Sequence, residues 1–156
     1  MQLNRKYALI LGIVFSAFFS QFAAAQPIEP VSWKFETTKK ADGVIEFKAT
    51  ATVQKPWHIY SQNTGKGGPV ATSFTFKPNP LLTIEGKLNE IGKLEKVYDN
   101  NFKTNVLYYS NTVSFVQVIK TRGKAKTNIS GTVEYMVCDD EQCLPPTKKA
   151  FDITIQ

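Results

Sequence analysis

Apolar and polar residues alternate with a period of two along most of the chain that follows residue 30. One alternating run extends from Val31 to Phe35 and a second from Ile45 to Val53. Because successive side chains on a β-strand point to opposite faces, each run predicts a strand with one buried face. Asp42-Gly43 lies between the two runs, and Asp-Gly readily adopts the positive φ angles of a tight turn. The pattern therefore predicts a β-hairpin over residues 31–53.

Alternation, or enrichment in β-branched and aromatic residues, predicts further strands along the rest of the chain. These segments are Trp57 to Ser61, Thr72 to Phe76, Leu82 to Glu85, Val106 to Ser110, Thr112 to Lys120, Thr127 to Cys138 and Lys149 to Ile155. No segment of the sequence carries a sustained apolar stripe at helical spacing. Several short strands separated by turn residues are typical of a sandwich or a barrel. We predict an all-β fold, an immunoglobulin-like β-sandwich, in a single domain over residues 26–156.

The first 25 residues have the pattern of a secretory signal peptide. Arg5 and Lys6 precede an uncharged, mostly apolar run from Ala8 to Phe19, and three consecutive alanines end at Ala25. A run of about a dozen residues is shorter than the roughly 20 that a membrane-spanning helix needs, and small residues at its end match a signal-peptidase site. We therefore expect cleavage before Gln26, a periplasmic location, and no membrane insertion of the mature chain.

Charge and histidine content argue against several classes of function. The formal net charge of +6 falls to +4 once Arg5 and Lys6 are removed, and the remaining basic residues are scattered over predicted strands and turns. Such a distribution is typical of a solvated surface rather than of a nucleic-acid interface. His58 is the only histidine, so a Ser-His-Asp hydrolase site is not indicated and a zinc site would lack ligands. We expect no nucleic-acid partner, no cofactor and no resident metal ion.

Cys138 and Cys143 are the only two cysteines, and the polar run Asp139 to Gln142 separates them. Two cysteines in an exported protein are expected to pair. A four-residue hairpin loop places its flanking residues opposite each other and within disulfide reach. The acidic residues of the loop disfavour a thiolate through like-charge repulsion. Pro145 and Pro146 follow, and because proline lacks a backbone donor we expect a stiff surface ridge suited to docking.

The residues alone leave three functions open for this cysteine pair. Closing a loop of about six residues stabilises a fold by roughly 2 kcal/mol, against about 4.7 kcal/mol for a 100-residue loop. The small gain favours thiol–disulfide exchange over a purely structural bridge, although a binding module with a structural disulfide is the main alternative. A periplasmic copper(I) carrier that also uses Met136 is less favoured, because its cysteines would have to stay reduced.

The segment from Gly131 to Pro146, with the sequence GTVEYMVCDDEQCLPP, resembles the amino-terminal periplasmic domain of the thiol:disulfide interchange protein DsbD. That family has a strand, a cysteine, a short loop, a second cysteine, an aromatic or apolar residue and Pro-Pro before a closing strand. Two further similarities are weaker. Lys55 to Tyr60 resembles the family's aromatic strand, and Tyr98 to Phe102 lies where the family has an acidic and aromatic cap loop.

The resemblance implies an immunoglobulin-like fold with the redox pair Cys138 and Cys143 at one exposed edge. It implies a relay that takes electrons from a membrane-embedded reductase and passes them to thioredoxin-like periplasmic proteins, including disulfide isomerases and cytochrome c maturation factors. The family's membrane domain and carboxy-terminal thioredoxin-like domain are not part of this sequence. We therefore expect the reductase to be a separate protein and this chain to act as a stand-alone relay.

The resemblance also implies a cap that shields the disulfide until a partner docks. A cap keeps an exposed disulfide from exchanging with any available thiol. Together with the Pro-Pro ridge, the residues expected to form the cap and the partner-binding surface are Asp99, Asn100, Asn101, Phe102, His58, Tyr60, Pro145 and Pro146. Taken without the resemblance, Phe102 is equally well explained as a core aromatic and Asp99 as a turn residue.

Overall fold

A computed structural model describes residues 28–100 and 102–156, and the regular elements in these two ranges are all β-strands. The predicted signal peptide, residues 1–25, lies outside the described residues. Over the same two ranges the structure contains no helix with the length and apolar character needed to cross a membrane. The strands are β1 (Val31–Ala41), β2 (Val44–Val53), β3 (His58–Tyr60), β4 (Ser73–Phe76), β5 (Leu82–Gly92), β6 (Glu95–Asp99), β7 (Thr104–Tyr109), β8 (Thr112–Thr121), β9 (Thr127–Tyr135), β10 (Val137–Cys138) and β11 (Thr147–Ile155).

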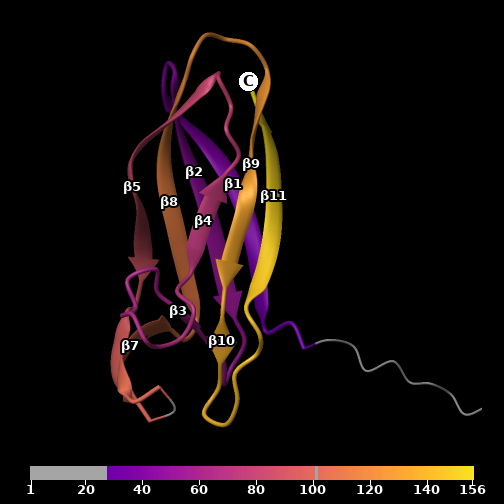
Figure 1. Cartoon of the computed structure of the whole chain (residues 1–156). Coiled ribbons are helices and arrows are strands. Elements are labelled where there is room, and N and C mark those ends of the chain that lie inside the picture. The colour runs from indigo at the N-terminus through magenta and orange to yellow at the C-terminus, as the bar shows by residue number, and fades with distance from the viewer. Residues whose placement is uncertain (1–27, 101) are drawn as a thin grey trace, which may run out of the picture.

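The strands form antiparallel sheets that give the predicted immunoglobulin-like sandwich (Figure 1). The large sheet has the order β1-β2-β8-β5, and the sheet β11-β9-β4 faces it. A third sheet, β10-β3-β7-β6, lies at one end of the molecule, below the facing sheet in Figure 1. We call it the end sheet. The expected all-β architecture is therefore confirmed.

Aromatic side chains fill the space between the large sheet and the facing sheet. Phe47 of β2 is fully buried, and its ring centroid lies 6.3 Å from that of Phe74, 5.3 Å from Phe76 and 4.9 Å from Phe151. Those three partners belong to β4 and β11 of the opposite sheet. Each such aromatic pair contributes about 0.5–1.5 kcal/mol beyond the burial of apolar area. The rings thus hold the two layers together, as the alternation of the sequence predicts.

The hairpin predicted over residues 31–53 is present. β1 and β2 pair in antiparallel register from Val31 opposite Val53 to Ala41 opposite Val44. Gly43 in the connecting turn has a φ of 70°, a left-handed conformation that glycine adopts without steric penalty. The turn residues and the strand alternation therefore specify the same structure.

The segment from Thr127 to Cys138 was expected to be one strand, and this expectation is wrong. Regular pairing stops at Met136, so β9 ends at Tyr135 and β10 comprises Val137 and Cys138. The reason is a change of partner. β9 pairs with β11 and β4 in the facing sheet, whereas β10 pairs with β3 in the end sheet. The chain thereby carries Cys138 from the core of the sandwich into the end sheet.

Two further elements differ from the sequence-based expectation. β5 does not stop at Glu85 but continues to Gly92, after an irregular register around Gly86, whose φ is 70°. β6, an edge strand with exposed Val97 and Tyr98, was not predicted. Because both of its faces are largely exposed, β6 lacks the strong apolar alternation on which the prediction relies.

Candidate functional site

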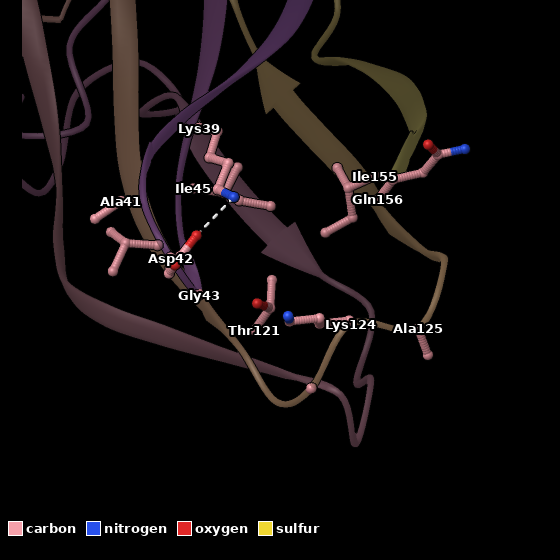
Figure 2. A pocket seen from close by; sticks show the side chains of 12 residues that line it. Lys39, Ala41, Asp42, Gly43, Ile45, Thr121, Lys124, Ala125, Ile155 and Gln156 are labelled. Atoms are coloured by element: carbon pink, nitrogen blue, oxygen red, sulfur yellow. Dashed lines mark ion pairs between the residues drawn. The ribbon is translucent and has the colours of Figure 1, made fainter.

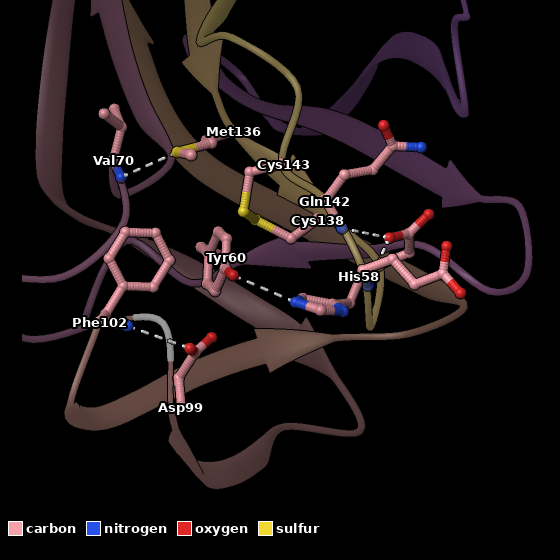
Figure 3. The surroundings of a disulfide bond; sticks show 11 residues. His58, Tyr60, Val70, Asp99, Phe102, Met136, Cys138, Gln142 and Cys143 are labelled. Atoms are coloured by element: carbon pink, nitrogen blue, oxygen red, sulfur yellow. Dashed lines mark hydrogen bonds between the residues drawn. A yellow bond between two sulfur atoms is a disulfide. The ribbon is translucent and has the colours of Figure 1, made fainter.

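Cys138 and Cys143 form a disulfide at the end of the sandwich where β10 runs out into a loop (Figure 3). Their Cα atoms are 4.0 Å apart, and the two residues form an isolated antiparallel bridge. Backbone hydrogen bonds close the loop, from Asp139 N–H to the Gln142 carbonyl at 2.9 Å and from Leu144 N–H to the Val137 carbonyl at 2.9 Å. The predicted pairing across a four-residue loop is therefore present.

The two sulfur-bearing residues differ in exposure. Cys138 is only 2% exposed, because it lies on β10 within a small cluster with Tyr60 and Val106. Cys143 packs against this cluster from outside and is only partly buried. A molecule that approaches this end of the sandwich therefore reaches Cys143 more readily than Cys138.

Asp139 organises the loop between the cysteines. Its carboxylate Oδ1 accepts hydrogen bonds from the backbone N–H of Glu141 at 2.9 Å and of Gln142 at 2.8 Å. These bonds to Glu141 and Gln142 lower the pKa of Asp139, so this carboxylate stays ionised at neutral pH. The negative charge that the sequence places beside the disulfide is thus a fixed feature of the loop.

His58 and Tyr60 of β3 lie next to the disulfide, as expected. His58 pairs with Cys138 in the register of β3 and β10. Its Nε2 shares a hydrogen bond of 3.1 Å with the Tyr60 hydroxyl. On its other side the His58 ring lies against Tyr108 of β7, with ring centroids 4.3 Å apart. The three rings form a continuous aromatic group adjoining Cys138.

This aromatic group is uncharged at neutral pH. Burial lowers the pKa of His58 below its usual 6.5, although nearby carboxylates, chiefly Asp99 and Asp140, act in the opposite direction. Burial also raises the pKa of Tyr60 and Tyr108 above the usual 10.0. A neutral imidazole does not stabilise a neighbouring thiolate as an imidazolium would. The site therefore lacks one common means of acidifying a cysteine.

Phe102 closes the site from the side of the β6–β7 turn. Its ring meets the Tyr60 ring edge to face, with centroids 6.4 Å apart, and it packs against the same cluster as Cys143. Asp99 at the end of β6 accepts a hydrogen bond of 3.2 Å from the Phe102 backbone N–H. Figure 3 shows both residues facing Tyr60 and His58 from this turn. Asp99 and Phe102, the two described residues of this turn that the sequence analysis assigns to the cap and that are joined by a hydrogen bond, therefore lie on the side of Tyr60.

The other expected partner-binding residues occupy the surface around the site. Asn100 is exposed in the β6–β7 turn, and Asn101 lies outside the described residues. Pro145 and Pro146 are exposed between Leu144 and β11, outside any strand, as a ridge requires. His58, Tyr108, Asp99, Asn100, Asp139 and Asp140 contribute to a shallow cleft of about 240 Å³ next to the loop.

Sequence reasoning missed Tyr108 and Val106 as members of the site. Both come from β7, which reaches the cysteines only because β3 pairs with β7 on one side and with β10 on the other. Their side chains share one face of β7 through period-two alternation. The local sequence, however, does not indicate which strands lie beside β7. Asp139 carried a usable signal, because an aspartate at the start of a loop commonly accepts bonds from the next residues.

A second hollow lies at the opposite end of the sandwich (Figure 2). It has a volume of about 330 Å³ and is lined by the β1–β2 turn, the segment after β8 and the end of β11. Lys39 on its wall forms an ion pair of 2.8 Å with Asp42. The hollow includes none of the residues that the sequence analysis proposed for the cysteine site, its cap or its partner-binding surface, so the disulfide end is the candidate site.

The profile of the family described as "Thiol:disulfide interchange protein DsbD, N-terminal" matches residues 24–155. This chain belongs to the DsbD N-terminal domain family. The match spans nearly all of the described residues, including the disulfide, β3 and the β6–β7 turn. A comparison with curated protein sequences gave no match.

Solved structures of DsbD-type domains have the same fold. The N-terminal periplasmic domain of ScsB from Proteus mirabilis is 14% identical with a TM-score of 0.61, over 83% of this chain and 48% of that one. The reduced DsbD N-terminal domain of Neisseria meningitidis is 18% identical with a TM-score of 0.52, over 78% and 84%. A chain of the complex between the DsbD and PilB N-terminal domains of Neisseria meningitidis is 15% identical with a TM-score of 0.53. The match covers 85% of this chain and 94% of that chain. This chain spans about half of the ScsB chain that it matches.

Proposed function

We propose that this chain is a thiol–disulfide relay in which Cys138 and Cys143 alternate between dithiol and disulfide. The observation that carries the proposal is a disulfide that closes a short loop at an accessible end of a DsbD-type domain. The Phe102 ring packs against the same cluster of residues. A bridge between neighbouring residues of one loop adds little stability. It is, however, well placed for attack by, or transfer to, a partner thiol.

The chemistry of the site favours electron donation from the reduced pair. A strongly oxidising disulfide requires a stabilised thiolate in its reduced form. Here His58 is neutral, and the ionised Asp139 lies in the loop between the cysteines, so the thiolate form gains little support. The dithiol is therefore inclined to pass its electrons on.

The difference in exposure supports separate steps for the two cysteines. Cys143, as a thiolate, attacks the disulfide of an oxidised partner, forms a mixed disulfide and releases one partner thiolate. Cys138 then loses its proton and attacks Cys143, which restores the Cys138–Cys143 disulfide and releases the second partner thiolate. Two electrons pass to the partner, and the two protons given up by the cysteines balance the two partner thiols.

We propose oxidised thioredoxin-like proteins of the periplasm as the acceptors, including disulfide isomerases and cytochrome c maturation factors. The proposal is supported by the complex that the Neisseria DsbD N-terminal domain forms with the PilB N-terminal domain, and by the periplasmic description of the ScsB domain. A separate membrane-embedded reductase would return the disulfide to the dithiol. In this scheme the Pro145-Pro146 ridge and the β6–β7 turn form the docking surface.

The reduction potential of the Cys138–Cys143 pair tests the proposal most directly. The purified protein is equilibrated in glutathione or dithiothreitol buffers, and the dithiol fraction is measured by thiol alkylation. We expect roughly −180 to −270 mV, the span of known exchange proteins. A value well below about −300 mV marks a structural bridge, and would replace the relay with a binding module that carries a structural disulfide.

Trapping with single-cysteine variants checks the order of steps. Cys138→Ala keeps Cys143 and should accumulate a mixed disulfide with an oxidised thioredoxin-like protein. Cys143→Ala is the matched control and should accumulate much less. Equal trapping by both variants would contradict the assignment of Cys143 as the attacking residue.

A further inference from the structure

Met136 brings a third sulfur to the disulfide end of the molecule. It precedes Cys138 by two residues, the spacing that directs two side chains of an extended segment to the same side. Met136 and Cys143 both pack against the cluster formed by Tyr60, Val106 and Cys138. Figure 3 shows the Met136 side chain beside Cys143, toward Val70. Three sulfur-bearing side chains therefore meet at one small patch.

The Met136 thioether is only weakly engaged in this position. Its Sδ accepts a hydrogen bond of 3.4 Å from the backbone N–H of Val70, a residue that is 38% exposed. Thioether sulfur is a weak acceptor, and water can replace it at an exposed amide. The break in pairing between β9 and β10 falls at Met136, which therefore belongs to neither strand. Little is therefore lost if Met136 turns its sulfur toward another group.

We propose that the reduced Cys138 and Cys143 together with Met136 form a copper(I) site. Thiolate and thioether are the soft ligands that select this ion. Tyr60, Val106 and Phe102 surround the sulfurs with apolar surface, which limits the access of water to a bound ion. Among the described residues there is no group of three or more His, Cys, Asp or Glu side chains arranged to hold a metal, so the proposed site depends on the Met136 thioether as its third ligand.

The site exists only in the dithiol form of the protein. A dithiol first reduces the Cys138–Cys143 bond, supplying two electrons and two protons and becoming a disulfide itself. Copper(I) then displaces the two thiol protons and binds two thiolates and the neutral thioether, without a further change of oxidation state. The acidic loop disfavours bare thiolates, but the positive charge of the bound ion compensates for them.

This site goes beyond the proposed relay and is tested separately from it. The dithiol can be prepared with a phosphine reductant, so copper binding is measured without a partner protein. Exchange with an oxidised thioredoxin-like protein is measured on copper-free protein. Loss of one property with retention of the other therefore identifies which of the two proposals has failed.

The first experiment is an anaerobic competition for copper(I) between the protein and a chromogenic chelator. The reduced protein, freed of reductant by gel filtration, should take up one copper(I) per chain. The oxidised protein, with the same fold and no free thiol, is the matched control and should take up none. Met136→Leu keeps the side-chain volume but removes the sulfur. It should weaken binding at least about tenfold, since loss of even an outer-shell partner weakens a metal site roughly 10- to 100-fold.

The second experiment does not depend on a variant. Met136 is the only methionine after Met1, so selenomethionine labelling places one selenium atom in the described part of the chain. X-ray absorption at the copper edge of the reduced, copper-loaded protein should show sulfur neighbours and a selenium neighbour. Equal copper uptake by the reduced and oxidised proteins would overturn the proposal. Unchanged affinity in Met136→Leu together with a spectrum lacking selenium would also overturn it.

Discussion

Phe102 is partly buried and packs against the cluster formed by Tyr60, Val106 and Cys138 at the disulfide end. Its ring touches Tyr60 edge to face, and its backbone N–H is held by the Asp99 carboxylate at 3.2 Å. The ring is only partly buried, so moving it away exposes little additional apolar area, and the free-energy cost of opening is correspondingly small. A surface ring held by the Asp99 hydrogen bond and by packing against Tyr60 can shield Cys143 and still give way to a partner.

Replacing Phe102 with Ala should therefore speed reduction of the disulfide by dithiothreitol several-fold, because the thiolate reaches the sulfur atoms without displacing the ring. The rate is measured under a large excess of dithiothreitol at constant pH. Tyr98→Ala is the control, since Tyr98 lies on the adjoining strand β6, is 56% exposed and is not among the residues that pack with Tyr60, Val106 and Cys138. An unchanged rate in Phe102→Ala would remove the cap from the mechanism.

At the scale of single elements, the strands that have a buried face were predictable from the sequence. The edge strand β6 and the break between β9 and β10 were not. The β1–β2 hairpin followed from alternation and from Asp42-Gly43, because both signals are local. β6 was missed because its side chains are mostly exposed. The break at Met136 was missed because β9 and β10 differ in the strands that they pair with, and pairing partners are not encoded in a local pattern.

The residues of the candidate site also fall into those that the local sequence predicts and those that only strand pairing brings together. Cys138 and Cys143 were predicted to pair because they flank a short loop, and the structure contains that disulfide. His58 was expected beside them through the family resemblance rather than from its own sequence neighbours. Tyr108 could not be placed there, because its position depends on β3 lying between β10 and β7.

Gly131 of β9 provides a test of the element packing. A Cβ added at this position would collide with the Thr75 carbonyl oxygen of β4 and would lie 2.7 Å from Cζ of Phe151 on β11. Neither a paired backbone nor a buried ring can move away cheaply. Gly131→Ala is therefore expected to lower the free energy of unfolding by about 1–3 kcal/mol, the usual penalty for overpacking.

Urea unfolding of the oxidised protein measures this penalty. Gly65→Ala is the matched control, because the nearest atom to its added Cβ is the Asn105 carbonyl oxygen at 4.0 Å, which is ordinary contact. A Gly131→Ala protein as stable as Gly65→Ala would mean that β4 and β11 do not close on β9 as tightly as the structure indicates.

For the molecule as a whole, a relay requires that both redox forms stay folded. The disulfide closes a loop of only about six residues, so its reduction should lower the free energy of unfolding by roughly 2 kcal/mol. The aromatic core between the large sheet and the facing sheet does not involve the cysteines and should retain the fold. Urea unfolding with and without a phosphine reductant measures the difference, and Cys138→Ser/Cys143→Ser serves as a reductant-independent reference. A reduced protein that is unfolded in the absence of urea would contradict the relay.

The disulfide and Gln156 lie at opposite ends of the sandwich, with the loop of β10 at the bottom of Figure 1 and the carboxy-terminal residue at the top. β11 runs nearly the full length between them and is paired with β9 throughout. A chemical tether attached at Gln156 would therefore present the cysteine end outward from a solid support. On a biosensor chip or an electrode, molecules immobilised in this way would share one orientation, with the sulfur cluster facing the solution and open to capture by passing proteins.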